Sequence, residues 1–339
     1  MWGKLAHRVS SLLGVEPLLS PAVRESWCMP RKIILDCDPG HDDAVALLLA
    51  QAHPAIELLA VTAVAGNQSL PKVTHNALGI ATLAGITAPI AAGADGPLQR
   101  SAEFAADIHG DSGLDGVVLP EASVALDARN AVDLIVELVM THEPGEITLV
   151  PTGPLTNIAL AVRREPRLVE RVREVVLMGG AAHLGNLTPV AEFNIAFDPE
   201  AAAEVFEAGW RVTMAGLDVT HQALATPEVA ERITAVGGPK AEFMTDLIAE
   251  YGRRYSDVQG FDSPPVHDPV AVAIVIDEEL GGGHVELRRA PIAVETKGEH
   301  TTGMTVVDLR PWVQRDVPTA VALGLDADWF WGLVTDAVR

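Results

Sequence analysis

Residues 31–50 read RKIILDCDPGHDDAVALLLA. A short apolar run is followed by four carboxylates around a Pro-Gly pair, and then by a strong helix-forming run. This pattern is typical of a buried strand, a tight turn and a helix. In open α/β sheets, ligands bind outside the carboxyl ends of the strands. We therefore expect the acids between residues 36 and 43 to lie at the ligand-binding edge of such a sheet.

Strand and helix patterns alternate from this segment towards the C-terminus. Strands are expected over 32–37, 56–65, 89–92, 146–150, 174–178 and 211–215. Helices are expected over 42–53, 71–85, 128–142, 154–165, 198–208, 226–236, 239–257, 270–276 and 326–338. Segments 284–295 and 303–309 have the pattern of a more antiparallel edge region. The sequence predicts an α/β fold with a single domain: an open, mostly parallel sheet with helices on both faces (a Rossmann-like core) and mixed edge strands.

The N-terminal segment differs from the rest of the chain. Its apolar positions would fit a short amphipathic helix, which several prolines then interrupt. We expect residues 1–30 to form an extension, either a dispensable segment before a start at Met29 or an arm that packs on a neighbour. The domain itself is expected over residues 31–339.

Composition limits the classes of partner. The chain has 339 residues, with 46 acidic against 24 basic side chains and a net charge of -22. Such a charge argues against nucleic acid or an anionic membrane as partner. Two cysteines, Cys28 and Cys37, form no disulfide framework, and no apolar run approaches the roughly 18 residues of a membrane span. We expect a soluble cytoplasmic protein whose acidity serves solubility or concentrates cations.

The acidic cluster consists of Asp36, Asp38, Asp42 and Asp43. Crowded carboxylates repel one another and cost desolvation energy, and a hard divalent cation with oxygen ligands is the simplest partner. An acid at a helix start can also be a plain cap, which would explain Asp42 alone. Capping needs one acid rather than four, so we interpret the group as a metal or catalytic site.

A second polar segment contains Asn186, Glu192 and Asn194, with Phe193 between them. Amides and carboxylates can pair with vicinal hydroxyl groups, as in sugar recognition. A polar loop with local Asx turns is the alternative interpretation.

Further candidates are histidines and tyrosines. His267 and Asp268 precede an apolar helix, where Asp268 could be a cap and His267 a satisfied buried histidine. His109 lies in a polar, glycine-containing loop. Tyr251 and Tyr255 are one helical turn apart, which favours a packing pair on a helix face.

Taken together, these segments resemble the nucleoside hydrolases, the calcium-dependent N-ribohydrolases of the inosine–uridine-preferring family. The resemblance runs from about residue 31 to the C-terminus and looks most like the bacterial pyrimidine-preferring branch. It rests on segments in an intact order: 36–43, 65–67, 151–157, 178–180, 185–194 and 267–268.

The resemblance implies a role for each matched residue. Ca²⁺ would be held by the carboxylates of Asp38, Asp43 and Asp268 and by the backbone carbonyl of Thr152. Asp38 would also deprotonate a Ca²⁺-bound attacking water, whereas Asp36 is left as a structural acid. The residues that would bind the nucleoside are Asp42, Asn67, Met178, Asn186, Glu192, Phe193, Asn194 and Asp268.

The implied reaction is hydrolysis of the N-glycosidic bond of uridine and cytidine, with inosine as a further candidate, to free base and ribose. A carboxylate-rich pocket suits the oxocarbenium-like transition state of this reaction. His267 and His109 are the candidates that would protonate the departing base. Mobile loops containing His109 and residues 251–262 would close over the base.

Other functions stay open at this point. A purine-preferring or broad-specificity hydrolase would differ mainly in its loops. A catalytically silent nucleoside- or ribose-binding protein would keep the pocket without turnover. The Asp-Cys-Asp sequence also suggests a haloacid-dehalogenase-type phosphatase, but Gly40 stands where those enzymes have Thr or Val. The resemblance further implies a homo-oligomer, a tetramer or dimer, that serves nucleoside salvage.

Overall fold

The computed structural model describes residues 29–313 and 315–339. Residues Arg31–Arg339 form one compact unit. The predicted N-terminal arm falls within residues 1–28, outside the described part of the chain. The description below concerns the unit Arg31–Arg339.

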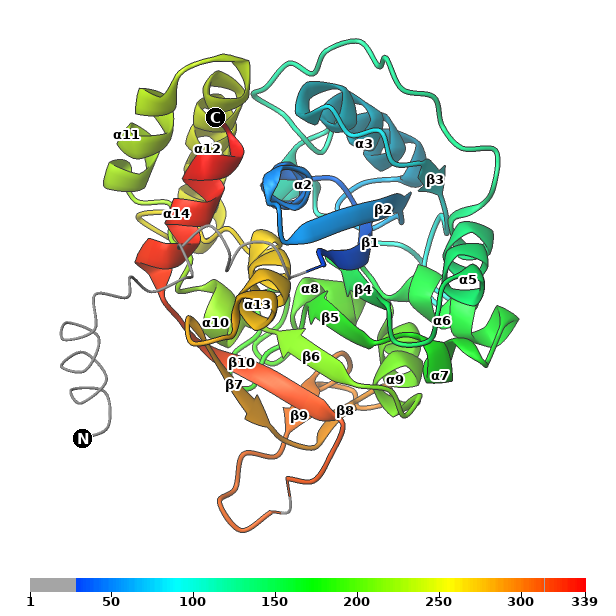
Figure 1. Ribbon diagram of the computed structural model, residues 1–339. Helices are drawn as coiled ribbons and strands as arrows, with labels where there is room; N and C mark the ends of the chain where they lie inside the picture. The colour runs from blue at the N-terminus through cyan, green and yellow to red at the C-terminus, as the bar shows by residue number, and fades with distance from the viewer. Residues whose placement is uncertain (1–28, 314) are drawn as a thin grey trace, which may run out of the picture. The chain divides into compact units, whose positions relative to one another are not determined.

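An eight-stranded sheet runs through this unit, in the order β3-β2-β1-β4-β5-β6-β10-β7 (Figure 1). All neighbouring strands pair in parallel except β7, which is antiparallel to β10. The strands are β1 (Arg31–Cys37), β2 (Ile56–Ala63), β3 (Ile90–Ala92), β4 (Ile147–Pro151), β5 (Glu174–Met178), β6 (Val212–Ala215), β7 (Val285–Arg289) and β10 (Thr319–Leu325). Strands β8 (Ile292–Val294) and β9 (Thr305–Val307) form a separate antiparallel pair. The predicted fold class is confirmed.

The strand order reverses between β1 and β4, which makes this the topological switch point of the sheet. Asp36 of β1 is in register with Pro151 of β4, so the chain leaves both strands at the same edge. The acids of 36–43 and the residues after β4 therefore flank one crevice.

Helices cover both faces of the sheet (Figure 1). They are α2 (His41–Ala52), α3 (Leu70–Ala84), α4 (Ala106–His109), α5 (Ala131–Thr141), α6 (Thr156–Arg164), α7 (Leu168–Arg171), α8 (Phe193–Phe197), α9 (Pro199–Glu207), α10 (Leu217–Thr220), α11 (Pro227–Val236), α12 (Pro239–Gln259), α13 (Pro269–Leu280) and α14 (Ala327–Ala337). None of these described helices combines the length and the apolar character needed to cross a membrane.

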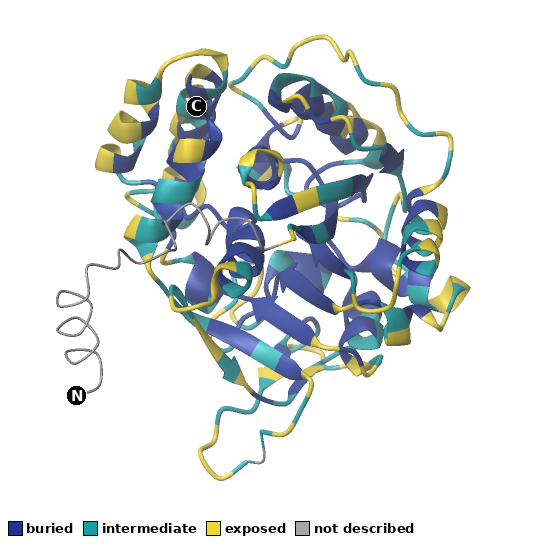
Figure 2. Ribbon diagram, in the orientation of Figure 1, coloured by how far each residue is buried: buried dark blue, intermediate teal, exposed yellow. Residues whose placement is uncertain are grey.

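Side chains of β1 alternate between two hydrophobic cores. Ile33 and Leu35 pack with α2, α13 and α14, whereas Ile34 packs with α5, α6 and α9 on the other face. This alternation follows from the two-residue period of a strand. Most residues of the central strands are buried, while many exposed residues lie on the outer sides of the helices (Figure 2).

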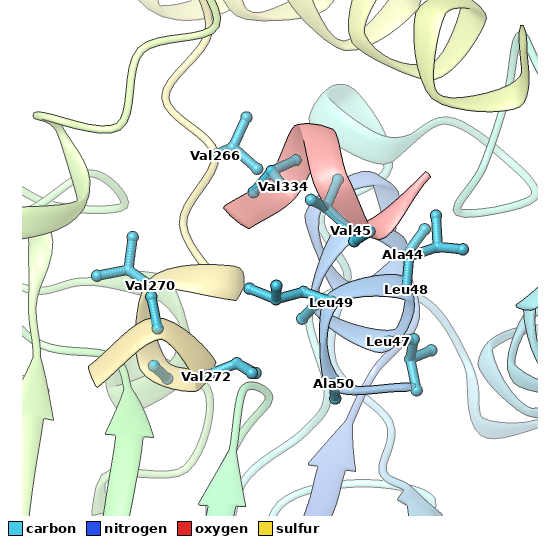
Figure 3. Close-up of a cluster of buried hydrophobic side chains, with 14 of the residues drawn as sticks. Ala44, Val45, Leu47, Leu48, Leu49, Ala50, Val266, Val270, Val272 and Val334 are labelled. Carbon is cyan, nitrogen blue, oxygen red and sulfur yellow. The ribbon is translucent and has the colours of Figure 1, made fainter. Parts of the chain in front are cut away.

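Helices α2 and α13 are buried to an unusual degree. Residues 41–50 of α2 and residues 269–277 of α13 are all buried. Their apolar side chains meet beside α14 (Figure 3). Both helices begin at the acidic edge of the sheet, so their dense packing fixes the positions of Asp42, Asp43 and Asp268.

The structure corrects three predictions about elements. The expected strand 284–295 divides into β7, at the edge of the main sheet, and β8, in the small sheet. Strand β10 was not predicted, and it joins β6 to β7. The helix expected over 239–257 extends to Gln259 as α12 and ends at Gly260 in a left-handed conformation, so most of the segment 251–262, expected as a loop over the base, is helical.

Candidate active site

A cavity of about 550 Å³ opens at the carboxyl edge of the sheet, over the switch point. Most of the residues that the sequence singled out line it: Asp42, Asn67, His109, Thr152, Met178, Asn186, Glu192, Phe193, Asn194, His267 and Asp268. Asp38 and Asp43 lie behind this lining and are buried. The fold thus brings together segments from seven parts of the chain, while the role of each residue stays a prediction.

Three carboxylates form the centre of the acidic cluster. Asp42, Asp43 and Asp268 each place one oxygen within 4.8 Å of the others. Asp43 accepts hydrogen bonds from the Gly40 amide at 2.9 Å and the Thr152 hydroxyl at 3.0 Å. Asp43, rather than Asp42, therefore caps the N-terminus of α2. Burial raises the pKa of Asp268 well above its usual range, and the charges of Asp42 and Asp43 raise it further.

Asp38 stands beside this cluster. Its Oδ2 accepts a hydrogen bond from the Asn67 amide at 2.6 Å, whereas its Oδ1 is buried without a hydrogen-bond partner among the described residues. Burial raises the pKa of Asp38 well above its usual range, and the charge of Asp43 adds to this. A buried carboxylate oxygen without a partner costs free energy unless a ligand satisfies it.

The donor set fits a hard metal ion. All the donor atoms are oxygens, the carboxylates repel one another, and Oδ1 of Asp38 has no hydrogen-bond donor in the described part of the chain. These are the properties of a site for a cation such as Ca²⁺ or Mg²⁺. The backbone carbonyl of Thr152 accepts a hydrogen bond from the side-chain amide of Asn194 at 2.8 Å. This contact places the Thr152 carbonyl beside the acidic group. The acidic group could therefore hold a metal ion.

Asp36 belongs to a different contact network. It accepts hydrogen bonds from the Thr62 hydroxyl at 2.5 Å and from the Asn157 amide at 2.8 Å. Burial raises its pKa to about 7. Asn157 also accepts from the Ala94 amide at 2.8 Å, which fixes the start of the loop after β3. Asp36 does not line the cavity, in agreement with a structural role.

Glu192 is held by backbone amides. Its carboxylate accepts hydrogen bonds from Gly180 at 2.8 Å, Asn194 at 2.8 Å and Ile195 at 3.1 Å, and it caps α8. Burial raises its pKa to about 7 in spite of these donors. Asn186 accepts from the Phe193 amide at 3.0 Å. The local turns expected of a polar loop are present, and the same side chains also face the cavity.

The opposite side of the cavity is aromatic. His267 is buried, with Nδ1 2.8 Å from the Thr220 hydroxyl and Nε2 2.7 Å from the Tyr255 hydroxyl. Burial lowers the pKa of His267 to about 3. Both ring nitrogens of His267 have hydrogen-bond partners, as expected for a buried histidine, and the ring also lines the cavity. Tyr251 and Tyr255 do pack on each other, with ring centroids 4.7 Å apart, but both line the cavity as well.

His109 is held from behind by the first residue of α2. Its Nδ1 accepts a hydrogen bond from the His41 amide at 3.3 Å. Burial lowers the pKa of His109 well below its usual range. The His41 ring stacks on Tyr251 with centroids 5.2 Å apart. Sequence reasoning gave His41 no role, although it lies inside the acidic motif.

Some lining residues were not singled out individually from the sequence, although Leu187 lies in segment 185–194 and Val258 in segment 251–262. Phe104, Leu187 and Val258 are exposed apolar side chains that line the cavity. They come from three segments far apart in the chain, and only the fold brings them together. The contribution of Tyr251 and Tyr255 had a weak signal, because they are the only tyrosines of the chain.

The fold and the cavity define an α/β enzyme with an acidic active site that could hold a metal ion. A family model described as inosine-uridine preferring nucleoside hydrolase matches residues 33–332. The chain belongs to this nucleoside hydrolase family, and it is a ribonucleoside hydrolase. The predicted family and enzyme class are confirmed.

Relatives with known names support this assignment. The chain is 55% identical over 316 residues to an inosine-uridine preferring nucleoside hydrolase of Leishmania major, covering 92% of this chain and 98% of the relative. It is 42% identical over 309 residues to a pyrimidine-specific ribonucleoside hydrolase of Escherichia coli, covering 91% and 97%. A solved purine-preferring ribonucleoside hydrolase from Gardnerella vaginalis has a TM-score of 0.83 and 32% identity, with 91% and 98% of the two chains covered.

Proposed function

We propose that this enzyme hydrolyses uridine, cytidine and inosine to free base and ribose. The observation that carries the proposal is the polarity of the cavity, which has buried carboxylates at one end and histidine and tyrosine side chains at the other. Carboxylates can stabilise a ribosyl oxocarbenium ion, and the opposite end can bind and activate the departing base.

The proposed metal ion is Ca²⁺, held by Asp38, Asp43 and Asp268 with the carbonyl of Thr152. A bound Ca²⁺ would lower the pKa of a water molecule and help to orient it. Asp38 has a buried oxygen to which no described residue donates a hydrogen bond, and this supports its role as the group that accepts the proton of the attacking water.

The polar lining residues would hold the ribose. Asn67 lies against the acidic cluster through hydrogen bonds with Asp38 and Asp43, while Glu192 and Asn194 are fixed by backbone contacts. Preorganised carboxylates need no rearrangement when positive charge develops on the ribose. Asp42, Met178, Asn186 and Phe193 complete this side of the cavity.

The histidines would act on the base. Burial makes both His267 and His109 neutral at pH 7, so each can donate one N–H to a base that leaves with negative charge. The two tyrosines would offer ring faces to either a pyrimidine or a purine.

Base preference is proposed to be broad rather than strictly pyrimidine. The 55% identical relative is named for inosine and uridine, whereas the pyrimidine-specific relative is 42% identical. A purine-preferring enzyme is the second candidate, because a solved structure of that name shares the fold at 32% identity. The resemblance also supports a cytoplasmic homo-oligomer in nucleoside salvage as part of the proposal.

The test is release of reducing sugar from uridine, cytidine, inosine and adenosine, with Ca²⁺ or with excess chelator. We expect ribose from the first three substrates, and a loss of at least ~100-fold on chelation. Asp38→Asn should lower kcat by about 10³-fold or more with the fold retained, whereas Asp246→Asn on the outer face of α12 should have no effect. Tight retention of nucleoside without ribose release would identify a binding protein and contradict the proposal.

A further inference from the structure

Thr220 is buried at the end of α10 and does not line the cavity. Its hydroxyl oxygen lies 2.8 Å from Nδ1 of His267, 47 residues further along the chain. The other ring nitrogen of His267, Nε2, lies 2.7 Å from the Tyr255 hydroxyl. Both ring nitrogens of His267 are therefore within hydrogen-bond distance of a hydroxyl group, one on α10 and one on α12. The neutral ring carries one N–H, and the two hydroxyl groups decide which nitrogen bears it.

Counting hydrogens from the Thr220 end gives one answer. A hydroxyl group has one hydrogen to donate. Among the described residues, the Thr220 hydroxyl has no hydrogen-bond partner except Nδ1 of His267. If Nδ1 carried the proton, the buried hydroxyl hydrogen would be left without an acceptor, which costs roughly 1–3 kcal/mol. Thr220 therefore donates to Nδ1, and the proton of the neutral ring is on Nε2.

The surroundings of Tyr255 agree with this assignment. Nε2 of His267 lies 2.7 Å from the Tyr255 hydroxyl oxygen, which can accept a hydrogen bond. Tyr255 lines the cavity, so its own hydroxyl hydrogen has room to find an acceptor there, whereas the hydrogen of Thr220 does not. With Nδ1 accepting from Thr220, the neutral ring donates its single hydrogen from Nε2 to Tyr255.

We propose that Thr220 is a positioning residue that holds His267 as the Nε2–H tautomer, with that N–H directed at the Tyr255 hydroxyl, on the side of the cavity where the base would leave. The inference rests on the proposed function above, because it concerns the donor to the leaving base. Thr220 touches no substrate. Without its hydroxyl, His267 can place its proton on Nδ1, and Nε2 then presents a lone pair that cannot stabilise a departing base.

The kinetic test compares two variants of the full-length enzyme. Thr220→Val keeps the shape of the side chain but has no hydroxyl, whereas Thr220→Ser keeps the donor. We expect Thr220→Val to lower kcat on uridine and inosine by ~100-fold with KM within ~3-fold, and Thr220→Ser to remain within ~5-fold of the parent. On p-nitrophenyl riboside, whose leaving group needs no proton, Thr220→Val should stay within ~3-fold.

Equal losses on nucleosides and on p-nitrophenyl riboside would overturn the proposal, because they would indicate general damage to the site. A Thr220→Val enzyme with the parent rate on uridine would overturn it as well. A Thr220→Ser enzyme as impaired as Thr220→Val would do the same, since the donor would then be irrelevant.

A second measurement does not depend on activity. Long-range ¹H–¹⁵N correlation spectra of histidine-labelled enzyme report which ring nitrogen carries the proton, and comparison with His267→Gln assigns the signal. We expect the Nε2–H pattern in the parent and in Thr220→Ser, and a loss of that pattern in Thr220→Val. An Nδ1–H pattern in the parent would refute the inference. If the parent hydrolysed no nucleoside, the proposed function would fail, while this spectrum would still decide the tautomer.

Discussion

Two glycines pack closely against the carboxylate of Asp38. A Cβ atom on Gly66 would lie 2.1 Å from Oδ2 of Asp38, and one on Gly153 would lie 2.6 Å from Oδ1. Neither glycine has a left-handed conformation, so close approach and not backbone freedom explains them. The two glycines thus hold Asp38, the proposed acceptor of the water proton, within a narrow space, where a small displacement would misalign its carboxylate.

Gly66→Ala should therefore damage catalysis more than folding. The added methyl would push Asp38 away by about an ångström, and misplacement on this scale costs on the order of 100-fold in kcat. Gly332→Ala is the matched control, because a Cβ at that position in α14 meets nothing within 4 Å. It should keep full activity and gain roughly 0.5–1 kcal/mol of stability. Uridine turnover and thermal melting check both changes, and an active Gly66→Ala enzyme would show that Asp38 tolerates displacement.

The individual acids of the site were predictable, because four carboxylates within eight residues have few explanations other than a cation. Contacts across long chain separations were not. Nothing near Thr220 in the sequence indicates that its hydroxyl reaches His267, since α10 and the segment before α13 meet only through tertiary packing.

At the scale of elements, the edge of the sheet opposite the cavity is held by a buried ion network. Arg31, at the start of β1, lies 2.8 Å from Glu174 at the start of β5 and 2.9 Å from Glu279 at the end of α13. Glu278, in the same turn of α13, lies 3.9 Å from Arg31. Burial raises the pKa of Glu278 to about 7, and the charge of Glu174 contributes to this.

The raised pKa gives a pH dependence with a definite sign. Between its ordinary value of 4.5 and about 7, Glu278 binds a proton in the folded state but not in the unfolded state. Its contribution to stability is therefore present below pH 4.5 and is lost as the pH rises through 7. Glu278→Gln should be more stable than the parent at pH 8, by on the order of 1–2 kcal/mol, and nearly equal to it at pH 4.5. Urea unfolding at both pH values checks this, and a less stable variant at pH 8 would show that the ion pair with Arg31 dominates.

Most elements of the sheet followed from their sequence patterns, and the misses have a common cause. Strand β10 reads TAVALGL, in which alanine, leucine and glycine give little intrinsic strand preference. Its conformation comes from pairing with β6 on one side and β7 on the other. The separation of β7 from β8 likewise depends on which strand each of them pairs with. The local sequence does not determine these pairings.

At the scale of the whole molecule, the acidic cluster is assembled from distant parts. Asp38 follows β1, Asp42 and Asp43 begin α2, and Asp268 precedes α13 by one residue. Helices α2 and α13 pack tightly on each other in the hydrophobic core. This packing holds the like charges at their N-termini close together. Hydrophobic burial supplies the free energy that offsets their repulsion.

Removal of one acid should therefore have opposite effects with and without metal. Without metal, Asp268→Asn should unfold at a higher temperature than the parent, because it removes a carboxyl group whose ionisation is opposed by burial and by the charges of Asp42, Asp43 and Asp38. With Ca²⁺ at about 100 times its dissociation constant, the parent should gain about 2.7 kcal/mol. The variant should lose most of this gain, because it lacks one ligand.

Thermal melts with chelator and with graded Ca²⁺ measure both effects, with Asp246→Asn as control. A variant that keeps the full Ca²⁺-dependent shift would exclude Asp268 from the metal site, and a destabilised metal-free variant would show that its hydrogen bond with Asp43 outweighs the repulsion.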